Sequence, residues 1–374
     1  MSDMKARITV LGLNVVGVSL LTLSALASPL TPGNLLLYRV GDGSAALTAN
    51  AAAVFLDEYT TGGTLVQSIA LPTTGSSALT AGGTASAEGM MSYSQDGSTI
   101  IFTGYRANAG ASQPSASSPT TVPRVVATLD PSTGNYNTSV SVTNYFGAIR
   151  SATSTDGSSL FYLGGGTGIM YVGSPGTNVG GVTNNTRLTR QVLLRNNGYL
   201  YGSNSDGSTA NKFNHYGILP TGPATETALV TLTTSAQSVG FALFDLNTSV
   251  PGLDTLYFAN AADSRIYKYS FDGTTWNANG TLTISSLAQG NIDGVVTGGG
   301  VRLFVSANQA GTSTVWTFFD GSGWNSTING TPQSLFSSPA NTAFRGLVYV
   351  VPEPGTWTIL ALGLGALFLI RRRI

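Results

Sequence analysis

The feature that most constrains the fold is a strand-and-turn pattern that repeats along the chain. Residues 269–276 read Tyr-Ser-Phe-Asp-Gly followed shortly by tryptophan, and residues 318–324 carry a near copy about 50 residues later. A related pattern, Ser-x-Asp-Gly before an aromatic strand segment, occurs at residues 94–102 and again at 154–162. Asp-Gly suits tight hairpin turns because glycine tolerates the positive φ that they require. Repeats of this length are typical of β-propellers and solenoids.

Between residues 30 and 350 helical periodicity is nearly absent, and short runs of Val, Ile, Leu, Phe and Tyr alternate with turn residues. We therefore predict an all-β fold, a β-propeller of six four-stranded blades. Seven blades or a β-helix are the alternatives. The innermost strands of the blades are expected to begin near Gly89, Ala148, Gln191, Gly240, Asp293 and Ala343.

The two ends of the predicted propeller complement each other. The last inner strand, at 343–349, has no partners after it, whereas the strand segments at 35–40, 54–59 and 65–71 have no inner strand before them. Pairing the two ends closes the ring and removes two exposed sheet edges. The Ser-x-Asp-Gly turns resemble blades of the broad bacterial propeller superfamily, and this resemblance implies architecture only.

The C-terminal segment has three ordered parts. They are a proline-bearing linker with Pro352, Glu353 and Pro354, an apolar run at 357–370, and the basic residues Arg371, Arg372 and Arg373. Arginines that follow an apolar helix favour the cytoplasmic side of a membrane. The arrangement closely resembles the PEP-CTERM sorting signal of Gram-negative bacteria. This resemblance implies a temporary anchor in the inner membrane, processing near Pro-Glu-Pro by an exosortase-type transpeptidase, and a biofilm setting.

The N-terminal residues read as a secretory signal peptide. Lys5 and Arg7 precede a largely apolar stretch at 8–23, and Ala25 and Ala27 supply small residues at the cleavage positions. A first transmembrane helix is the alternative, although the stretch is short for a bilayer span. We therefore expect a signal peptide at 1–27, a propeller-like extracellular domain at 28–350, and a sorting tail with a short transmembrane segment at 351–374.

The composition limits the possible partners. The chain has no cysteine, so an exported domain of this length must be stabilised by a large core rather than by disulfides. Only 9% of the residues are charged and the formal net charge is zero. No basic surface is available for phosphate backbones, so nucleic acid is not an expected partner. The polar residues are mainly Gly, Ser, Thr and Asn, whose hydroxyl and amide groups suit contact with extracellular polysaccharide.

Groups that could catalyse a reaction are scarce. His215 is the only histidine, which excludes a metal site with two histidines, and no Gly-x-Ser-x-Gly sequence accompanies it. Asp57 and Glu58 are adjacent, so on a strand they point to opposite faces and cannot share a site. We expect this pair at a solvated edge or turn, and we predict no catalytic residue.

The central channel of the predicted propeller is the candidate site. Glu88 and Asp293 fall at the entrances of inner strands, and Arg150, Arg190 and Arg345 lie on or near inner strands. Such a channel can hold an anionic sugar, or its charges can pair with one another.

Calcium would find its nearest set of ligands in Glu88, Asn291 and Asp293. Because calcium takes six to eight oxygen ligands, these three make a weak site, and no cofactor or metal is expected.

Two tryptophans, Trp276 and Trp324, occupy equivalent places in two blades. Exposed tryptophan can stack on sugar rings, whereas a tryptophan within a repeat can pack between blades. The sequence as a whole favours a non-catalytic structural or adhesive component of an exopolysaccharide matrix. The alternatives are a propeller enzyme that acts on polysaccharide or a lactone, and a protein-binding scaffold.

Overall fold

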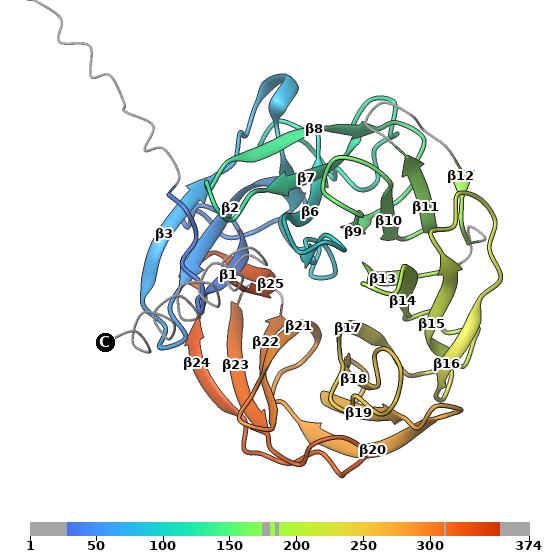
Figure 1. Ribbon diagram of the computed structural model, residues 1–374. Coiled ribbons are helices and arrows are strands. Elements are labelled where there is room, and N and C mark those ends of the chain that lie inside the picture. Colours follow the sequence, from blue (N-terminus) through green and yellow to red (C-terminus); the bar gives the residue numbers. More distant parts are fainter. Residues whose placement is uncertain (1–27, 174–179, 184–186, 310–311, 352–374) are drawn as a thin grey trace, which may run out of the picture.

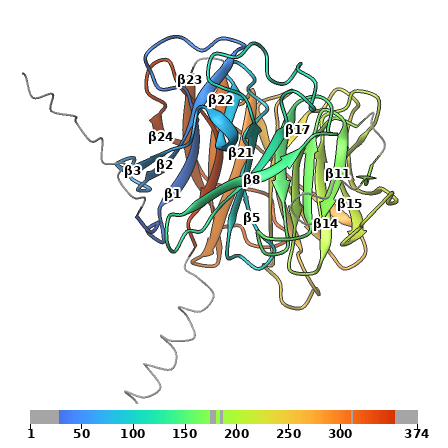
Figure 2. The same ribbon diagram turned by 90° about the horizontal axis from the view of Figure 1, so that it is seen from above.

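The computed structural model describes residues 28–173, 180–183, 187–309 and 312–351. In these residues twenty-five strands form sheets arranged as a ring around a central channel, the arrangement of a β-propeller (Figure 1). Seen from above, the strands of successive sheets stand side by side around the ring (Figure 2). The prediction of an all-β propeller is confirmed.

Four of the sheets are separate four-stranded blades with sequential antiparallel strands. The first contains β9 (Ile149–Thr153), β10 (Phe161–Gly165), β11 (Gly168–Gly173) and β12 (Gly180–Gly181). The second contains β13 (Thr189–Leu194), β14 (Tyr199–Asn204), β15 (Asn211–Ile218) and β16 (Thr227–Thr231). The third contains β17 (Ser238–Phe244), β18 (Thr255–Asn260), β19 (Arg265–Phe271) and β20 (Trp276–Thr283). The fourth contains β21 (Gln289–Thr297), β22 (Gly300–Gln309), β23 (Thr312–Asp320) and β24 (Gln333–Ser337).

The remaining strands form one nine-stranded sheet rather than two separate blades. Its members are β1 (Leu35–Val40), β2 (Ala51–Tyr59), β3 (Leu65–Ala70), β4 (Thr80–Gly82), β5 (Ser92–Tyr93), β6 (Ile100–Tyr105), β7 (Arg124–Leu129), β8 (Tyr136–Val142) and β25 (Ala343–Tyr349). The short strand β4 joins the two halves, because it pairs with both β2 and β6. This pairing is possible because β2 extends beyond β3, and its residues 51–53 are left free for β4. The structure therefore has four separate blades where six were predicted.

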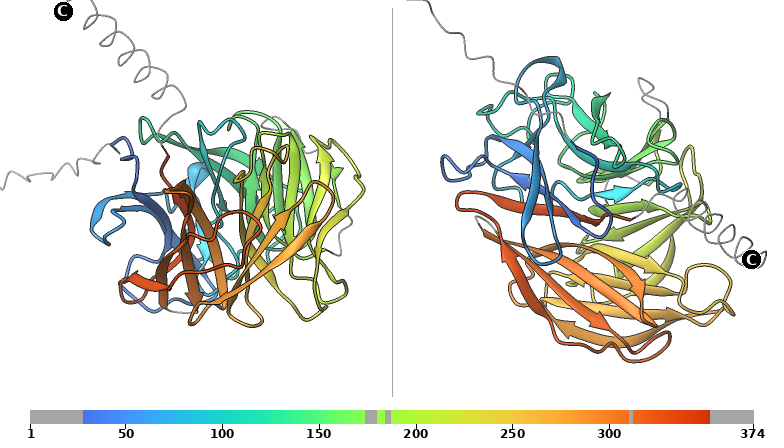
Figure 3. Two further views of the ribbon diagram at one scale, coloured as in Figure 1. Left: turned by 60° about the horizontal axis from the view of Figure 1, so that its bottom comes forward. Right: turned by 60° about the vertical axis from the view of Figure 1, so that its left-hand side comes forward.

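The predicted closure of the ring by the two ends of the domain is confirmed. Strand β25 pairs antiparallel with β1, and Leu36 lies opposite Val348. Figure 3 shows the blue strands β1–β3 beside the red strand β25 and the orange strands β21–β24. Tyr59 stacks on Phe336 with ring centroids 4.5 Å apart, so that an apolar seam joins the closing sheet to the neighbouring blade. Closure leaves neither terminal strand with an open edge at this position.

A buried ion pair joins the last two blades. The Lys268 ammonium on β19 lies 2.9 Å from the Asp320 carboxylate at the end of β23, and neither side chain is exposed. The Tyr257 hydroxyl donates a second hydrogen bond to Asp320, at 2.6 Å. Burial alone would raise the pKa of Asp320, but hydrogen bonds from Ser322, Tyr257 and Lys268 hold it below its ordinary value. Asp320, which the sequence places in a repeated turn, therefore also connects two blades.

The adjacent acids of β2 differ from expectation. Asp57 and Glu58 point to different partners, as predicted, but both are buried rather than at a solvated edge. Asp57 forms an ion pair with Arg39 at 2.5 Å. Glu58 accepts hydrogen bonds from the side chains of Asn34 and Gln67 at 2.6 and 2.7 Å. The reason is that β2 lies inside the closing sheet, with neighbours on both sides.

None of the described residues forms a helix that is long and apolar enough to cross a membrane. The expected signal peptide at 1–27 and the expected apolar segment at 357–370 lie outside the described residues.

The closing strand generates a prediction about stability. Phe344 of β25 is fully buried in the seam, where its ring contacts Tyr59 and Phe336. Replacing it by alanine (Phe344→Ala) should lower the free energy of unfolding by about 3–5 kcal/mol, because it leaves a cavity at the point of closure. The matched control is Ile218→Ala on β15, whose side chain is 60% exposed. The control should change stability by less than about 0.5 kcal/mol.

Chemical denaturation followed by fluorescence measures both variants. If Phe344→Ala unfolds at the same denaturant concentration as the control, β25 does not stabilise the closed ring.

Candidate functional site

The channel is lined by the innermost strand of each sheet. In Figure 1 the labelled strands β9, β13, β17, β21 and β25 lie nearest the centre of the ring. These strands begin close to the positions predicted from the sequence. Each has one edge that faces the channel, and backbone N–H groups on that edge have no partner strand. Unpaired buried backbone groups are costly, so they need side-chain or water partners.

Polar side chains of neighbouring inner strands supply those partners. The Ser151 hydroxyl on β9 accepts a hydrogen bond from the backbone N–H of Val192 on β13, at 3.1 Å. The Gln191 side-chain oxygen on β13 accepts one from the N–H of Phe241 on β17, at 2.7 Å. Inner strands that are not paired in one sheet are thus connected around the channel.

Where the ring closes, the Asn291 side chain likewise accepts hydrogen bonds from backbone N–H groups of other strands. Its side-chain oxygen accepts hydrogen bonds from the N–H of Leu347 on β25 at 2.7 Å and from the N–H of Met91 just before β5 at 3.4 Å. Two residues further along β21, the Asp293 carboxylate accepts from the N–H of Tyr349 at 2.9 Å. Both predicted channel residues therefore hold the closing strand in place.

Asp293 also lines a small pocket. A cavity of about 30 Å³ is lined by Asp293, Arg195, Gln191 and Tyr93, among others. This volume can hold a water molecule, but it is far below the roughly 300 Å³ or more of a small-molecule site. Burial raises the pKa of Asp293, and the N–H of Tyr349 and the charge of Arg195 oppose this rise.

Glu88 is only 3% exposed and is bonded within the protein. Its carboxylate accepts hydrogen bonds from the Tyr105 hydroxyl at 2.6 Å and from the N–H of Gly82 at 3.1 Å. Arg345 donates to the carbonyl oxygens of Gly82 and Gly83, at 3.0 and 2.7 Å. Burial raises the pKa of Glu88, and the nearby charge of Arg345 opposes this rise. Glu88 and Arg345 together fasten the loop that follows β4.

The three residues considered as a calcium set are thus engaged elsewhere. Asn291 uses its only acceptor oxygen on two backbone N–H groups, and Glu88 and Asp293 accept hydrogen bonds from other groups. Among the described residues no group of three or more His, Cys, Asp or Glu side chains could hold a metal ion. A general acid or base must reach the substrate, and Glu88 is enclosed by protein.

The other charges of the channel are two arginines on adjacent inner strands. Arg150 on β9 donates to the carbonyl of Thr189 at 3.1 Å, and Arg190 on β13 donates to the Ser205 hydroxyl at 2.6 Å. Burial and the neighbouring charge of Arg150 lower the pKa of Arg190 to about 9. In the described part of the chain neither guanidinium has a carboxylate within ion-pair distance. This mouth of the channel is therefore positively charged and partly exposed.

The other residues that the sequence analysis considered for a site, Trp276, Trp324 and His215, lie away from the charged residues of the channel. The indole N–H of Trp324 donates to the carbonyl of Phe271 in the preceding blade, at 3.2 Å. Trp276 packs on the Phe271 ring, with centroids 5.4 Å apart, and both tryptophans keep part of their surface exposed. His215 lies edge-on to Tyr199 at 4.9 Å, and burial lowers its pKa.

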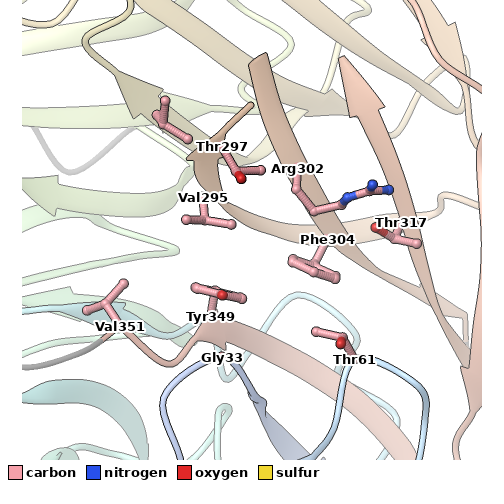
Figure 4. A pocket seen from close by; sticks show the side chains of 10 residues that line it. Gly33, Thr61, Val295, Thr297, Arg302, Phe304, Thr317, Tyr349 and Val351 are labelled. Carbon is pink, nitrogen blue, oxygen red and sulfur yellow. The ribbon is translucent and has the colours of Figure 1, made fainter. Parts of the chain in front are cut away.

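Sequence reasoning missed a groove near the closure. A groove of about 550 Å³ lies outside the channel, between the hairpin of β21 and β22 and the end of β25. No single segment of the sequence predicts this groove, because its walls come from strands that only ring closure brings together (Figure 4).

The channel network generates a prediction about Asn291. Replacing it by alanine (Asn291→Ala) leaves the N–H groups of Leu347 and Met91 without their partner, so stability should fall by about 1–3 kcal/mol. The matched control is Asn135→Ala, an exposed asparagine just before β8, which should change stability by less than about 0.5 kcal/mol. Urea unfolding of the two variants decides: equal midpoints would show that the axial hydrogen bonds do not stabilise the ring.

Asp293 generates a prediction about pH. A carboxyl whose pKa is raised by folding destabilises the folded state as pH rises above its ordinary value of 3.8, until the raised pKa is passed. Asp293→Asn cannot titrate and keeps an acceptor for the N–H of Tyr349. The melting temperature of wild type minus that of the variant should therefore decrease as pH rises from 3.8 toward neutrality. Thermal melts across this range test it, and a difference that grows with pH would mean that Arg195 dominates instead.

Comparison with known proteins identifies the sorting signal. Residues 350–373 match the PEP-CTERM protein-sorting motif. No curated protein is significantly similar in sequence to this chain. Among solved structures, the Pseudomonas aeruginosa periplasmic gluconolactonase PpgL is 11% identical, with a TM-score of 0.49 over 85% of this chain and 99% of that one. A putative 6-phosphogluconolactonase from Bacteroides fragilis is 10% identical, with a TM-score of 0.49 and 82% coverage of each chain.

The β-propeller domain of Cps50 (Swd1) from Myceliophteria thermophila is 10% identical, with a TM-score of 0.40 over 82% of this chain and 90% of that one. These likenesses say nothing about chemistry. The matched motif indicates export to the cell envelope or surface and implies an exosortase as the processing partner. The chain is therefore a β-propeller protein that carries a PEP-CTERM protein-sorting motif at residues 350–373.

Proposed function

We propose that this protein is an exported, non-catalytic component of the extracellular matrix of a Gram-negative bacterium, and that its propeller binds exopolysaccharide. One observation carries the proposal. The acidic and amide groups expected at the channel, Glu88, Asn291 and Asp293, all accept hydrogen bonds from the protein's own groups. A propeller that uses these groups for closure keeps little acid–base chemistry for a substrate.

Two surface features support a polysaccharide ligand. The guanidinium groups of Arg150 and Arg190, which form no ion pair among the described residues, suit the carboxylates of an acidic sugar polymer, since arginine binds carboxylates through paired N–H groups. The partly exposed rings of Trp276 and Trp324 suit the apolar faces of sugar rings. The uncharged composition of the remaining surface disfavours nonspecific attraction to other polyanions.

The proposal includes the route to the surface. The signal peptide at 1–27 directs export, with cleavage after Ala27, and the apolar run at 357–370 holds the protein in the inner membrane for a time. Arg371, Arg372 and Arg373 then stay on the cytoplasmic side. An exosortase processes the tail near Pro352, Glu353 and Pro354 and releases the propeller to the matrix.

The proposal also includes the blade count. We treat the nine-stranded sheet as two four-stranded blades bridged by β4, namely β25-β1-β2-β3 and β5-β6-β7-β8. With the four separate blades this gives six. The short β4 then has the role of a bridge between the first two blades, and the inner strands β5 and β25 are equivalent to the other four.

Size-exclusion chromatography of residues 28–351 with the producer's own exopolysaccharide tests the function. The protein should elute with intact polymer, because it binds without cleaving. Arg150→Gln combined with Arg190→Gln should weaken this co-elution, whereas Arg265→Gln, a change at an exposed arginine on β19, should not.

Each other outcome contradicts the proposal in its own way. Polymer that becomes shorter would identify an enzyme acting on polysaccharide. Protein and polymer that elute apart would favour a protein-binding scaffold. Co-elution that survives the arginine changes but is lost in Trp276→Ala or Trp324→Ala would place the sugar on the tryptophans instead of at the channel mouth.

A further inference from the structure

The groove beside the closing strand is lined by a pair of stacked aromatic side chains and by one arginine. Phe304 on β22 and Tyr349 on β25 stack with ring centroids 5.7 Å apart and nearly parallel planes. Val295 on β21 and Arg302 on β22 line the same wall. Figure 4 shows Phe304 and Tyr349 next to each other, with Val351 toward one end of the pocket and Thr61 toward the other. The volume of about 550 Å³ is enough for a short peptide segment.

The chain itself leaves the propeller at this groove. Val351 lines the groove and is the last residue that the structure describes. Its backbone N–H donates to the Tyr93 hydroxyl at 3.2 Å, and the N–H of Val350 donates to the carbonyl of Asn34 at 2.9 Å. The point at which the chain leaves the propeller is therefore fixed by the fold, and it lies beside the groove.

The sequence after Val351 has the chemistry that the groove complements. Pro352-Glu353-Pro354 favours the extended polyproline conformation, since proline fixes its own φ and restricts the residue before it. Grooves lined by aromatic side chains are the usual receptors for such segments. Two extended residues span about 7 Å, so the linker is long enough for the Glu353 carboxylate to reach the groove.

Arg302 carries a positive charge, opposite to that of the Glu353 carboxylate. Its guanidinium lies 5.3 Å from the centre of the Phe319 ring, and within the described ranges it has no carboxylate at ion-pair distance. It is partly buried, so a carboxylate that enters the groove would meet a charge that water screens only in part.

We propose that this groove binds the protein's own sorting linker, with Pro352 and Pro354 against the Phe304–Tyr349 stack and Glu353 paired with Arg302. Because Gly33 and Thr61 come from the N-terminal side of the ring closure and Phe304 and Tyr349 from the C-terminal side, the groove is complete only in the folded propeller. Docking therefore places the sorting motif against the finished ectodomain and not against an unfolded chain. This inference depends on the matched motif and not on polysaccharide binding.

Disulfide trapping in the full chain, purified in detergent micelles, tests the docking. The protein has no cysteine, so two introduced thiols report on one contact without background. The docked pair is Thr61→Cys in the groove with Gly355→Cys at the end of the linker. The control pair is Ser98→Cys with Gly355→Cys; Ser98 is exposed and follows β5, whose Tyr93 hydroxyl accepts from Val351.

The intramolecular disulfide of the docked pair should form at least about tenfold faster than that of the control pair, because docking raises the effective concentration of the two thiols. Adding Arg302→Glu to the docked pair should remove most of this advantage. Adding Glu353→Arg as well should restore it, since the two charges are then exchanged. Unchanged melting temperatures of the groove variants verify that the propeller remains folded.

Three results would overturn the proposal. Equal rates for the two cysteine pairs would mean that the linker does not occupy the groove. A rate insensitive to Arg302→Glu would remove Glu353 as the anchoring group. Disulfides that form only between molecules would assign the groove to a second copy of the chain.

Discussion

The rest of this structure depends on the free edges of its innermost strands. A propeller points one edge of each inner strand at its axis, where backbone N–H groups face neither a partner strand nor bulk water. Here Ser151, Gln191, Asn291 and Asp293 accept those hydrogen bonds across the gaps between sheets. The axis is thus a network of side chain to backbone bonds, and it connects sheets that share no strand pairing.

This constraint explains why the channel is poor in reactive groups. An amide or carboxylate placed at the axis gains most by satisfying a buried N–H, and it is then unavailable to a substrate. Glu88 shows the same tendency at the entrance, where Tyr105 and Gly82 occupy its carboxylate. The arginines at the channel mouth and the groove beside β25 are two positions that lie outside this network.

Closure also decides where the chain ends meet. Pairing of β25 with β1 fixes the exit of the chain at Val351, next to aromatic side chains from the neighbouring blade. The same contact that seals the ring therefore builds the groove, so that fold completion and presentation of the sorting linker share one set of residues. The buried pair of Lys268 and Asp320 secures the adjacent blade against this seam.

The sequence by itself determined the all-β class, the start of each inner strand and the pairing of the two chain ends, because period, turn residues and strand alternation are local properties. It also identified the sorting motif, whose parts are contiguous. It did not reveal that β4 would bridge two blades, that Asp57 and Glu58 would be buried, or that Asn291 would hold two backbone N–H groups. Those outcomes depend on contacts between residues distant in the chain, Asn291 and Met91 among them, and only the closed tertiary structure brings such groups within hydrogen-bond distance.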